Sequence, residues 1–182
     1  YTVYKNPTVK NVTDATTGVQ PCYLQMRMKI KDEDGKMVTD QEVLNMVRQT
    51  IRYDDTYNGS WDTTGEGKKL RQGRIPGYSE KELVMLPMVN PNFQEVDTGN
   101  LGEYLFQYQG GKNGIMDIDE EAVLFTDVAI PIEWGVKEIK KAGRFQIQVT
   151  AEAIQANGFA SARDAFQVLG ESVEKGALDE QG

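Results

Sequence analysis

The sequence predicts an all-β fold, an antiparallel β-sandwich of jelly-roll type with one or two short inserted helices. Two segments near the C-terminus, 128–134 and 145–153, alternate between apolar and polar residues. Such alternation is typical of strands with one dry face and one solvated face. Further strand-like segments are separated by turns, without the strand–helix–strand repeat of a parallel sheet. These observations together favour a sandwich of antiparallel strands.

The chain of 182 residues is predicted to form one domain, residues 1–169. A chain of this length can bury a core without disulfides, and its single cysteine, Cys22, has no partner for an internal bridge. We interpret Cys22 as a buried, unreactive thiol. Residues 170–182 are rich in acidic residues and glycine and are expected to form a mobile tail.

The N-terminal elements are expected to be an edge strand and a core strand. Residues 1–12 are extended, and Pro7 restricts them to a sheet edge or the start of a strand. After a polar loop, the strand 23–30 places four apolar residues on one face (Leu24, Met26, Met28 and Ile30). Asp34-Gly35 is a favoured turn pair and ends this strand.

One amphipathic helix is expected from about Asp40 to Gln49. Thr39 and Glu42 have the spacing of a capping box, in which the threonine accepts a hydrogen bond from the N3 amide. Apolar residues then recur at helical spacing (Val43, Leu44, Val47 and Ile51). This pattern predicts a helix that covers one part of the core.

The middle of the chain is predicted to contain a hairpin, a loop and two strands. The hairpin spans 53–63 around Asn58-Gly59, a pair typical of tight turns between strands. A loop rich in glycine, lysine and arginine follows at 65–77, and the strands are expected at 81–89 and 104–109.

The C-terminal part is predicted to contain two alternating strands and a helix. In 128–134 the inward residues are expected to be Val128, Ile130, Ile132 and Trp134. In 145–153 they are expected to be Phe145, Ile147, Val149, Ala151 and Ala153. The pattern then changes to a helix that contains Asp164-Ala165-Phe166.

The composition argues against several classes of function. The net charge of −8 disfavours nucleic acid as a partner, because phosphates require a basic surface. No apolar run approaches the ~20 residues of a membrane span. The absence of histidine excludes an HExxH zinc site and catalysis by Ser-His or Cys-His pairs. We therefore predict no catalytic residue, no cofactor other than calcium, and no enzymatic activity.

Two acidic segments are candidate calcium sites. Asp32 and Asp34 begin like a calcium loop, but Lys36 and Val43 replace later ligands, so a solvated turn is favoured. The second segment is denser (Asp117, Asp119, Glu120 and Glu121). A charged surface loop is the favoured interpretation there, and a calcium site is the alternative.

Aromatic and basic residues have two interpretations each. Two aromatic groups (Tyr53, Tyr57 and Trp61; Tyr104, Phe106 and Tyr108) are core or cross-strand residues in the favoured interpretation, and a sugar-stacking platform in the other. The basic residues of the 65–77 loop (Lys68, Lys69, Arg71 and Arg74) are solvated in the favoured interpretation. In the alternative they bind an anionic polymer or an acidic face of another copy.

Several segments resemble the TasA/camelysin family, the substrates of SipW-type signal peptidases. Residues 123–131 with Trp134 resemble a late strand of that family, and 145–159 is closer still because 151–156 reads Ala-Glu-Ala-Ile-Gln-Ala. Asp164-Ala165-Phe166 matches its Asp-Ala-[Phe/Trp] helix. Residues 5–11 are similar to its Lys-x-Pro-x-Val-x-Asn strand, and residues 22–28 to its Ala-Tyr-Val-Arg strand. Residues 32–113 are largely this chain's own.

The resemblance implies a secreted structural protein that forms extracellular fibres in the biofilm matrix or on the surface of Gram-positive bacteria. Members are thought to donate an N-terminal strand to the next subunit, which implies an assembly role for Tyr1, Val3, Tyr4 and Val9. The implied partners are copies of this chain, with other matrix proteins or surface glycans. Because the chain begins at Tyr1 rather than Met, we expect that an upstream segment was removed. Either this upstream segment includes the donor strand, or the subunits assemble in another way.

Two other functions remain as alternatives at this stage. The first is a cell-surface adhesin or glycan-binding jelly roll that uses the aromatic residues. The second is a peptidase, a label that the family has received after camelysin. The chain has no histidine and only one cysteine, so no zinc site supports the peptidase.

Overall fold

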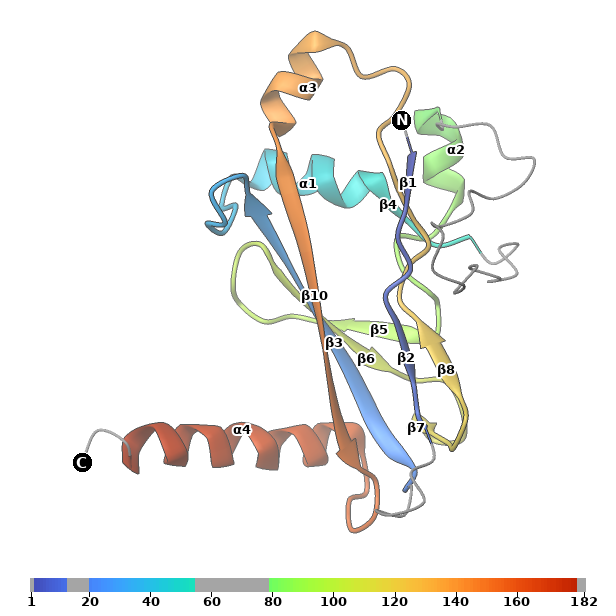
Figure 1. Cartoon of the computed structure of the whole chain (residues 1–182), viewed down its shortest axis with the longest axis vertical. Coiled ribbons are helices and arrows are strands. Elements are labelled where there is room, and N and C mark those ends of the chain that lie inside the picture. The colour runs from blue at the N-terminus through green and yellow to red at the C-terminus, as the bar shows by residue number, and fades with distance from the viewer. Residues whose placement is uncertain (1, 13–19, 55–78, 180–182) are drawn as a thin grey trace, which may run out of the picture.

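The computed structural model describes residues 2–12, 20–54 and 79–179 (Figure 1). The fold is mostly β, with four helices in the described ranges. All strand pairs are antiparallel, and the sheets do not close into a barrel. The expected β class and antiparallel pairing are therefore confirmed. The expected hairpin at 53–63 lies outside the described residues except for Tyr53 and Asp54, and the basic loop at 65–77 lies wholly outside them.

The larger sheet is built around β3 (Cys22–Asp32), and its strand order is β10-β3-β6-β5. Its other members are β10 (Phe145–Gln155), β6 (Glu103–Tyr108), β5 (Phe93–Val96) and the short β7 (Ile115–Met116), which pairs with the start of β3. The alternating apolar residues of β3 are buried, as the sequence predicts (Leu24, Met26, Met28 and Ile30). This central strand therefore carries the core on one face.

The second layer contains β1 (Thr2–Tyr4), β9 (Asp127–Ala129) and β4 (Ile51–Arg52), with β2 (Thr8–Lys10) paired to β8 (Glu121–Val123). Both pairs have the same register. Thr2 lies opposite Ala129, and Thr8, six residues later, lies opposite Val123, six residues earlier. Between them the Lys5 N–H donates to the Thr126 carbonyl at 3.2 Å. The N-terminal segment is thus one continuous edge strand, which accommodates Pro7.

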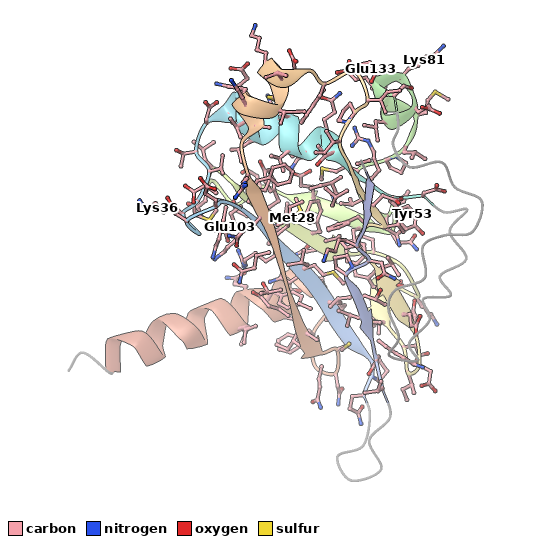
Figure 2. The ribbon with its side chains drawn as sticks, turned by 45° about the horizontal axis from the view of Figure 1, so that its top comes forward. Met28, Lys36, Tyr53, Lys81, Glu103 and Glu133 are labelled. Atoms are coloured by element: carbon pink, nitrogen blue, oxygen red, sulfur yellow. The ribbon has the colours of Figure 1, made fainter. Side chains whose placement is uncertain are left out.

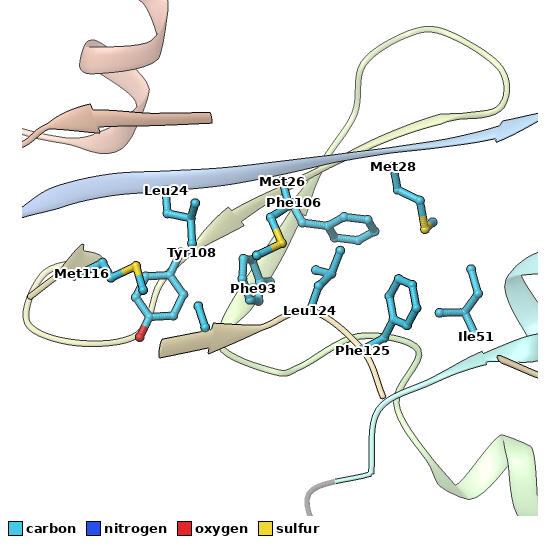
Figure 3. Close-up of a cluster of buried hydrophobic side chains, with 11 residues drawn as sticks. Leu24, Met26, Met28, Ile51, Phe93, Phe106, Tyr108, Met116, Leu124 and Phe125 are labelled. Atoms are coloured by element: carbon cyan, nitrogen blue, oxygen red, sulfur yellow. The ribbon is translucent and has the colours of Figure 1, made fainter. Parts of the chain in front are cut away.

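The main core lies between these two layers (Figure 3). Met26 and Met28 of β3 and Phe106 of β6 face Leu124 and Phe125, which connect β8 to β9. Each of these five side chains is at most 2 % exposed. Burial of such side chains is the main favourable contribution to folding.

The two layers are joined on one side through Asn90. Its backbone N–H donates to the Leu124 carbonyl at 2.8 Å, and its Nδ2 donates to the Val123 carbonyl at 3.0 Å. Its Oδ1 accepts from the Asn92 N–H at 2.9 Å. This buried side chain therefore connects the segment before β5 with the segment after β8.

Helix α1 (Gln41–Thr50) confirms the predicted helix, but its cap differs from the prediction. The N-cap is Asp40, not Thr39, and its carboxylate accepts from the Glu42 and Val43 N–H groups. Both residue types cap helices well, and the helix begins one residue later than the Thr39 box requires. Val43, Leu44 and Val47 pack against Ile30 of β3.

The strand predicted at 81–89 was wrong, because residues 80–85 form helix α2 (Glu80–Met85). Ser79 and Glu82 form a capping box there, with the Ser79 N–H donating to the Glu82 carboxylate at 2.8 Å. Leu83 is fully buried and packs against Ala129. A capping signal therefore outweighed the apolar content of this segment.

The strand predicted at 128–134 was too long, and its faces were inverted. β9 ends at Ala129, and Asp127 and Ala129 are its buried residues. Ile132, which was expected inside, is 65 % exposed. Trp134 is buried as expected, because a turn that bonds its N–H to the Pro131 carbonyl brings it inward. Helix α3 (Val136–Ala142) follows and was not predicted.

The predicted C-terminal helix is α4 (Ala162–Asp179), which continues into the segment expected to be a tail. Ser161 accepts from the Asp164 N–H at 3.2 Å at its start. Ala162, Ala165 and Phe166 are buried against Tyr23, on the face of β3 opposite the main core. No helix in the described ranges is long and apolar enough to cross a membrane.

We expect Asn90→Ala to destabilise the fold, because it removes the side-chain link between the layers and leaves the Val123 carbonyl without that donor. The expected loss is about 1–3 kcal/mol of unfolding free energy, measured by urea denaturation. Asn100→Ala is the control, since Asn100 is exposed and, among the described residues, only its backbone groups make hydrogen bonds. Equal midpoints for the two variants would contradict this role of Asn90.

Candidate functional site

The candidate functional site is the outer edge of β10. This strand pairs with β3 along its whole length, from Phe145 opposite Asp32 to Gln155 opposite Cys22. Within the described ranges, no strand pairs with its other side. Figure 1 shows β10 as the long outer strand of its sheet. Such an edge presents backbone groups that can pair with another chain.

The hydrogen bonds of β3 identify which backbone groups of β10 face outward. The Ile30 N–H donates to Gly102 and its carbonyl accepts from Val38, so both groups point away from β10. Antiparallel ladders alternate residue by residue. The backbone groups of four residues therefore point to the open side (Ile147, Val149, Ala151 and Ala153).

The same four residues lie on the core-facing side of β10. Ala151 lies opposite Met26 and Ala153 opposite Leu24, and both partners are fully buried. Ala151 and Ala153 are nevertheless exposed, and Ile147 and Val149 are only half-buried. The second layer therefore leaves an apolar strip of β10 uncovered next to the unpaired backbone groups.

The other border of this open side is the N-terminal strand. Among the described residues, β1 pairs only with β9, and β2 pairs only with β8. Of the predicted assembly residues, Val3 lies opposite Val128, Tyr4 opposite Asp127 and Val9 opposite Ala122. Tyr1 lies outside the described residues. These residues therefore belong to the first strand of the domain and not to the edge of β10.

A polar network on the opposite face fastens β10 to its sheet. Arg27 of β3 bonds to Glu103 of β6 and, at 3.4 Å, to Glu152 of β10. Burial alone would lower the pKa of the Arg27 guanidinium, but the hydrogen bond to Glu103 and the charge of Glu152 raise it overall. Glu152 is the only charged residue of β10, and it is paired within the chain. It therefore does not protect the open edge from pairing with another strand.

The acidic segments do not converge on a cation in the described residues. No group of three or more acidic or cysteine side chains is arranged to hold a metal there. Glu120 accepts from the Tyr108 hydroxyl and from the Asp117 N–H at 2.8 Å, while Asp119 faces Lys10. Asp32 caps its own turn by accepting from the Asp34 and Lys36 N–H groups. The calcium hypothesis therefore gains no support from this geometry.

Glu120 also affects two neighbouring groups. Burial is the largest cause of the raised pKa of the Tyr108 hydroxyl, and the hydrogen bond to Glu120 raises this pKa further. Burial, and secondly the charge of Glu120, raise the pKa of the half-buried Cys22 thiol. A raised pKa means less thiolate at neutral pH, in agreement with an unreactive cysteine.

The aromatic residues of β6 serve the core. Phe106 and Tyr108 are buried, and Tyr108 packs edge-on against Phe93 with ring centroids 5.4 Å apart. Tyr104 lies beneath the Arg48 guanidinium, 4.4 Å from its ring centroid. Tyr57 and Trp61, like the basic residues of the 65–77 loop, lie outside the described residues.

No protein-family model, curated protein or solved structure matches this chain. The resemblance to the TasA/camelysin family therefore stays a prediction. The open edge itself is a feature that the sequence reasoning missed. A signal was present in Ala151 and Ala153, because two small residues on an apolar face indicate that little packs above them.

We expect Cys22 to react slowly with a thiol reagent such as DTNB at pH 8 in the native protein, because its pKa is raised. Glu120→Gln removes the nearby negative charge and should increase the labelling rate. The rates are followed by absorbance, with urea-unfolded protein as the reference. Native labelling as fast as in urea would contradict the assignment of Cys22 as a half-buried, unreactive thiol.

Proposed function

We propose that this chain is a self-assembling structural protein, a jelly-roll subunit whose copies join by β-strand addition into fibres. The observation that carries the proposal is the unpaired edge of β10, where unpaired backbone groups and an apolar strip occur on the same residues. Extracellular location in a biofilm matrix or on a cell surface rests on the resemblance to the TasA/camelysin family.

A strand added at this edge would pair with the unpaired backbone groups and would also cover the apolar strip. An incoming strand would pair with the backbone groups of Ile147, Val149 and Ala151, and each such hydrogen bond contributes about 0.5–1.5 kcal/mol. Its alternate side chains would cover the half-exposed apolar strip of β10. Backbone bonds then supply affinity, and the side chains supply specificity.

The proposed donor is the N-terminal strand of another copy. In its own chain this strand pairs with β8 and β9, so a donor role requires its release. From Lys5 to Val12 no residue is fully buried, and Val9 is the only one that packs against the main core. Among residues 5–12, release therefore withdraws one side chain, Val9, from the main core. A contact of this head-to-tail kind does not close, and so it produces a filament.

No observation favours the two alternative functions. The glycan-binding alternative needs exposed aromatic side chains, but Phe106 and Tyr108 are in the core. The peptidase alternative has no supporting group of residues in the described ranges. We therefore propose no catalytic role.

The proposal predicts that Ala151→Lys prevents fibre formation, because it places a charge on the apolar strip where the incoming strand must lie. Gln148→Lys is the matched control, since it adds the same charge to the solvent-facing side of the same strand. Fibres are scored by negative-stain electron microscopy and by sedimentation.

Wild type and Gln148→Lys should form fibres, and Ala151→Lys should form none while keeping an unchanged circular dichroism spectrum. Fibres of equal length and amount in all three proteins would refute strand addition at β10. Absence of fibres from the wild type under every condition would refute the proposed function as a whole.

A further inference from the structure

Exposed apolar side chains gather at one end of the molecule, on α2, α3 and the segment between β9 and α3. We call this set the head surface (Val84, Met85, Ile132, Val136 and Ile139). Its members are between 53 % and 80 % exposed. Figure 2 shows Lys81 and Glu133 at this end, and the Glu80 N–H donates to the Glu133 carboxylate at 2.8 Å. The hydrogen bond holds α2 and the segment before α3 together.

The head surface also presents positive charge. Lys81, Lys137 and Lys140 are exposed and have no carboxylate partner in the described ranges. The nearby carboxylates of Glu133 and Glu138 accept hydrogen bonds from backbone N–H groups at helix starts. Because Glu80 and Glu82 of α2 are also exposed, the excess of positive charge lies on α3, which carries three lysines and one glutamate.

The opposite end combines apolar residues with negative charge. We call this set the tail surface (Val12, Asp117, Ile118, Asp119 and Glu121). Val12 is 62 % and Ile118 is 43 % exposed, and the Asp119 N–H donates to the Asn11 carbonyl at 2.7 Å, which keeps the two apolar residues close. The Asp119 side chain is 70 % exposed, and its carboxylate lies 3.9 Å from the Lys10 amine.

The two surfaces lie at opposite ends of the long axis. In Figure 1, α3 is at the top, whereas β7 and the start of β8, which flank the tail surface, are at the bottom. The apolar side chains of α3 are flanked by lysines, and those of the tail surface are flanked by carboxylates, so these two faces are complementary to each other. Such a pair of surfaces forms an open, repeating contact and not a closed dimer.

We propose that the head surface of one copy binds the tail surface of the next, with Val136 and Ile139 against Ile118 and Val12. Lys137 and Lys140 face Asp119 and Glu121 in this contact. This inference rests on the proposed function, in that it names a second contact between copies of an assembling subunit. It differs from strand addition in that none of its residues belongs to β10, and Val12 alone adjoins the proposed donor strand, just after β2.

The contact depends on opposite charges near the surface, so salt should weaken it. A charge-reversal experiment tests the pairing directly. One variant carries Lys137→Glu with Lys140→Glu, a second carries Asp119→Lys with Glu121→Lys, and a third carries all four changes. Circular dichroism checks that each variant is folded, and sedimentation measures its association.

We expect each double variant to associate at least tenfold more weakly than the wild type at low ionic strength. The fourfold variant should recover association, because it restores opposite charges in the reverse arrangement. A fourfold variant that stays as weak as the double variants would overturn the proposal, and so would unchanged association of the double variants.

Carbodiimide crosslinking of wild-type protein at high concentration gives a readout that does not require fibres. It joins lysine amines to carboxylates in direct contact, and a mixture of isotope-labelled and unlabelled chains identifies links between copies. We expect links from Lys137 or Lys140 to Asp119 or Glu121, and their absence would overturn the proposal.

Ala151→Lys separates the two contacts. If this variant forms no fibres but keeps the crosslinks, both proposals hold. If it forms normal fibres and keeps the crosslinks, strand addition at β10 fails and the end-to-end contact stands.

Discussion

The two layers are bonded together on one side and open on the other, and the rest of this structure depends on this difference. Backbone N–H and C=O groups at the edge of a sheet must find partners in the chain, in water or in another molecule. On one side, Asn90 and its neighbours bond the layers together. On the other side, β10 and the N-terminal strand each end their sheet, and no strand of the described residues joins them.

The open side leaves β10 with the properties that proteins usually avoid at an edge. Long edge strands are normally protected from pairing with another chain by proline, by lysine or by a covering segment. β10 contains neither proline nor lysine, and its single charge, Glu152, is held by Arg27. The head and tail surfaces add a second feature typical of assembly, since they place opposite charges at opposite ends.

The parts of the fold that were predictable are those in which local pattern and environment agree. Alternation identified β3 and β6 because the apolar residues on one face of each strand pack in the main core, and helical spacing identified α1. The pattern of 128–134 misled because β9 is flanked on both sides and its buried residues, Asp127 and Ala129, are polar or small. The open edge was not predictable in this way, because alternation describes faces and says nothing about which neighbour a strand lacks.

Hydrogen exchange of individual β10 amides, measured by NMR on the monomer and after quenching of assembled material, tests the central claim most directly. The account predicts that Gln148 and Thr150 are protected in both states, because their N–H groups bond to β3. It predicts that Val149 and Ala151 exchange freely in the monomer and become protected on assembly. Fast exchange of Val149 and Ala151 in the assembled state, or their protection in the monomer, would contradict it.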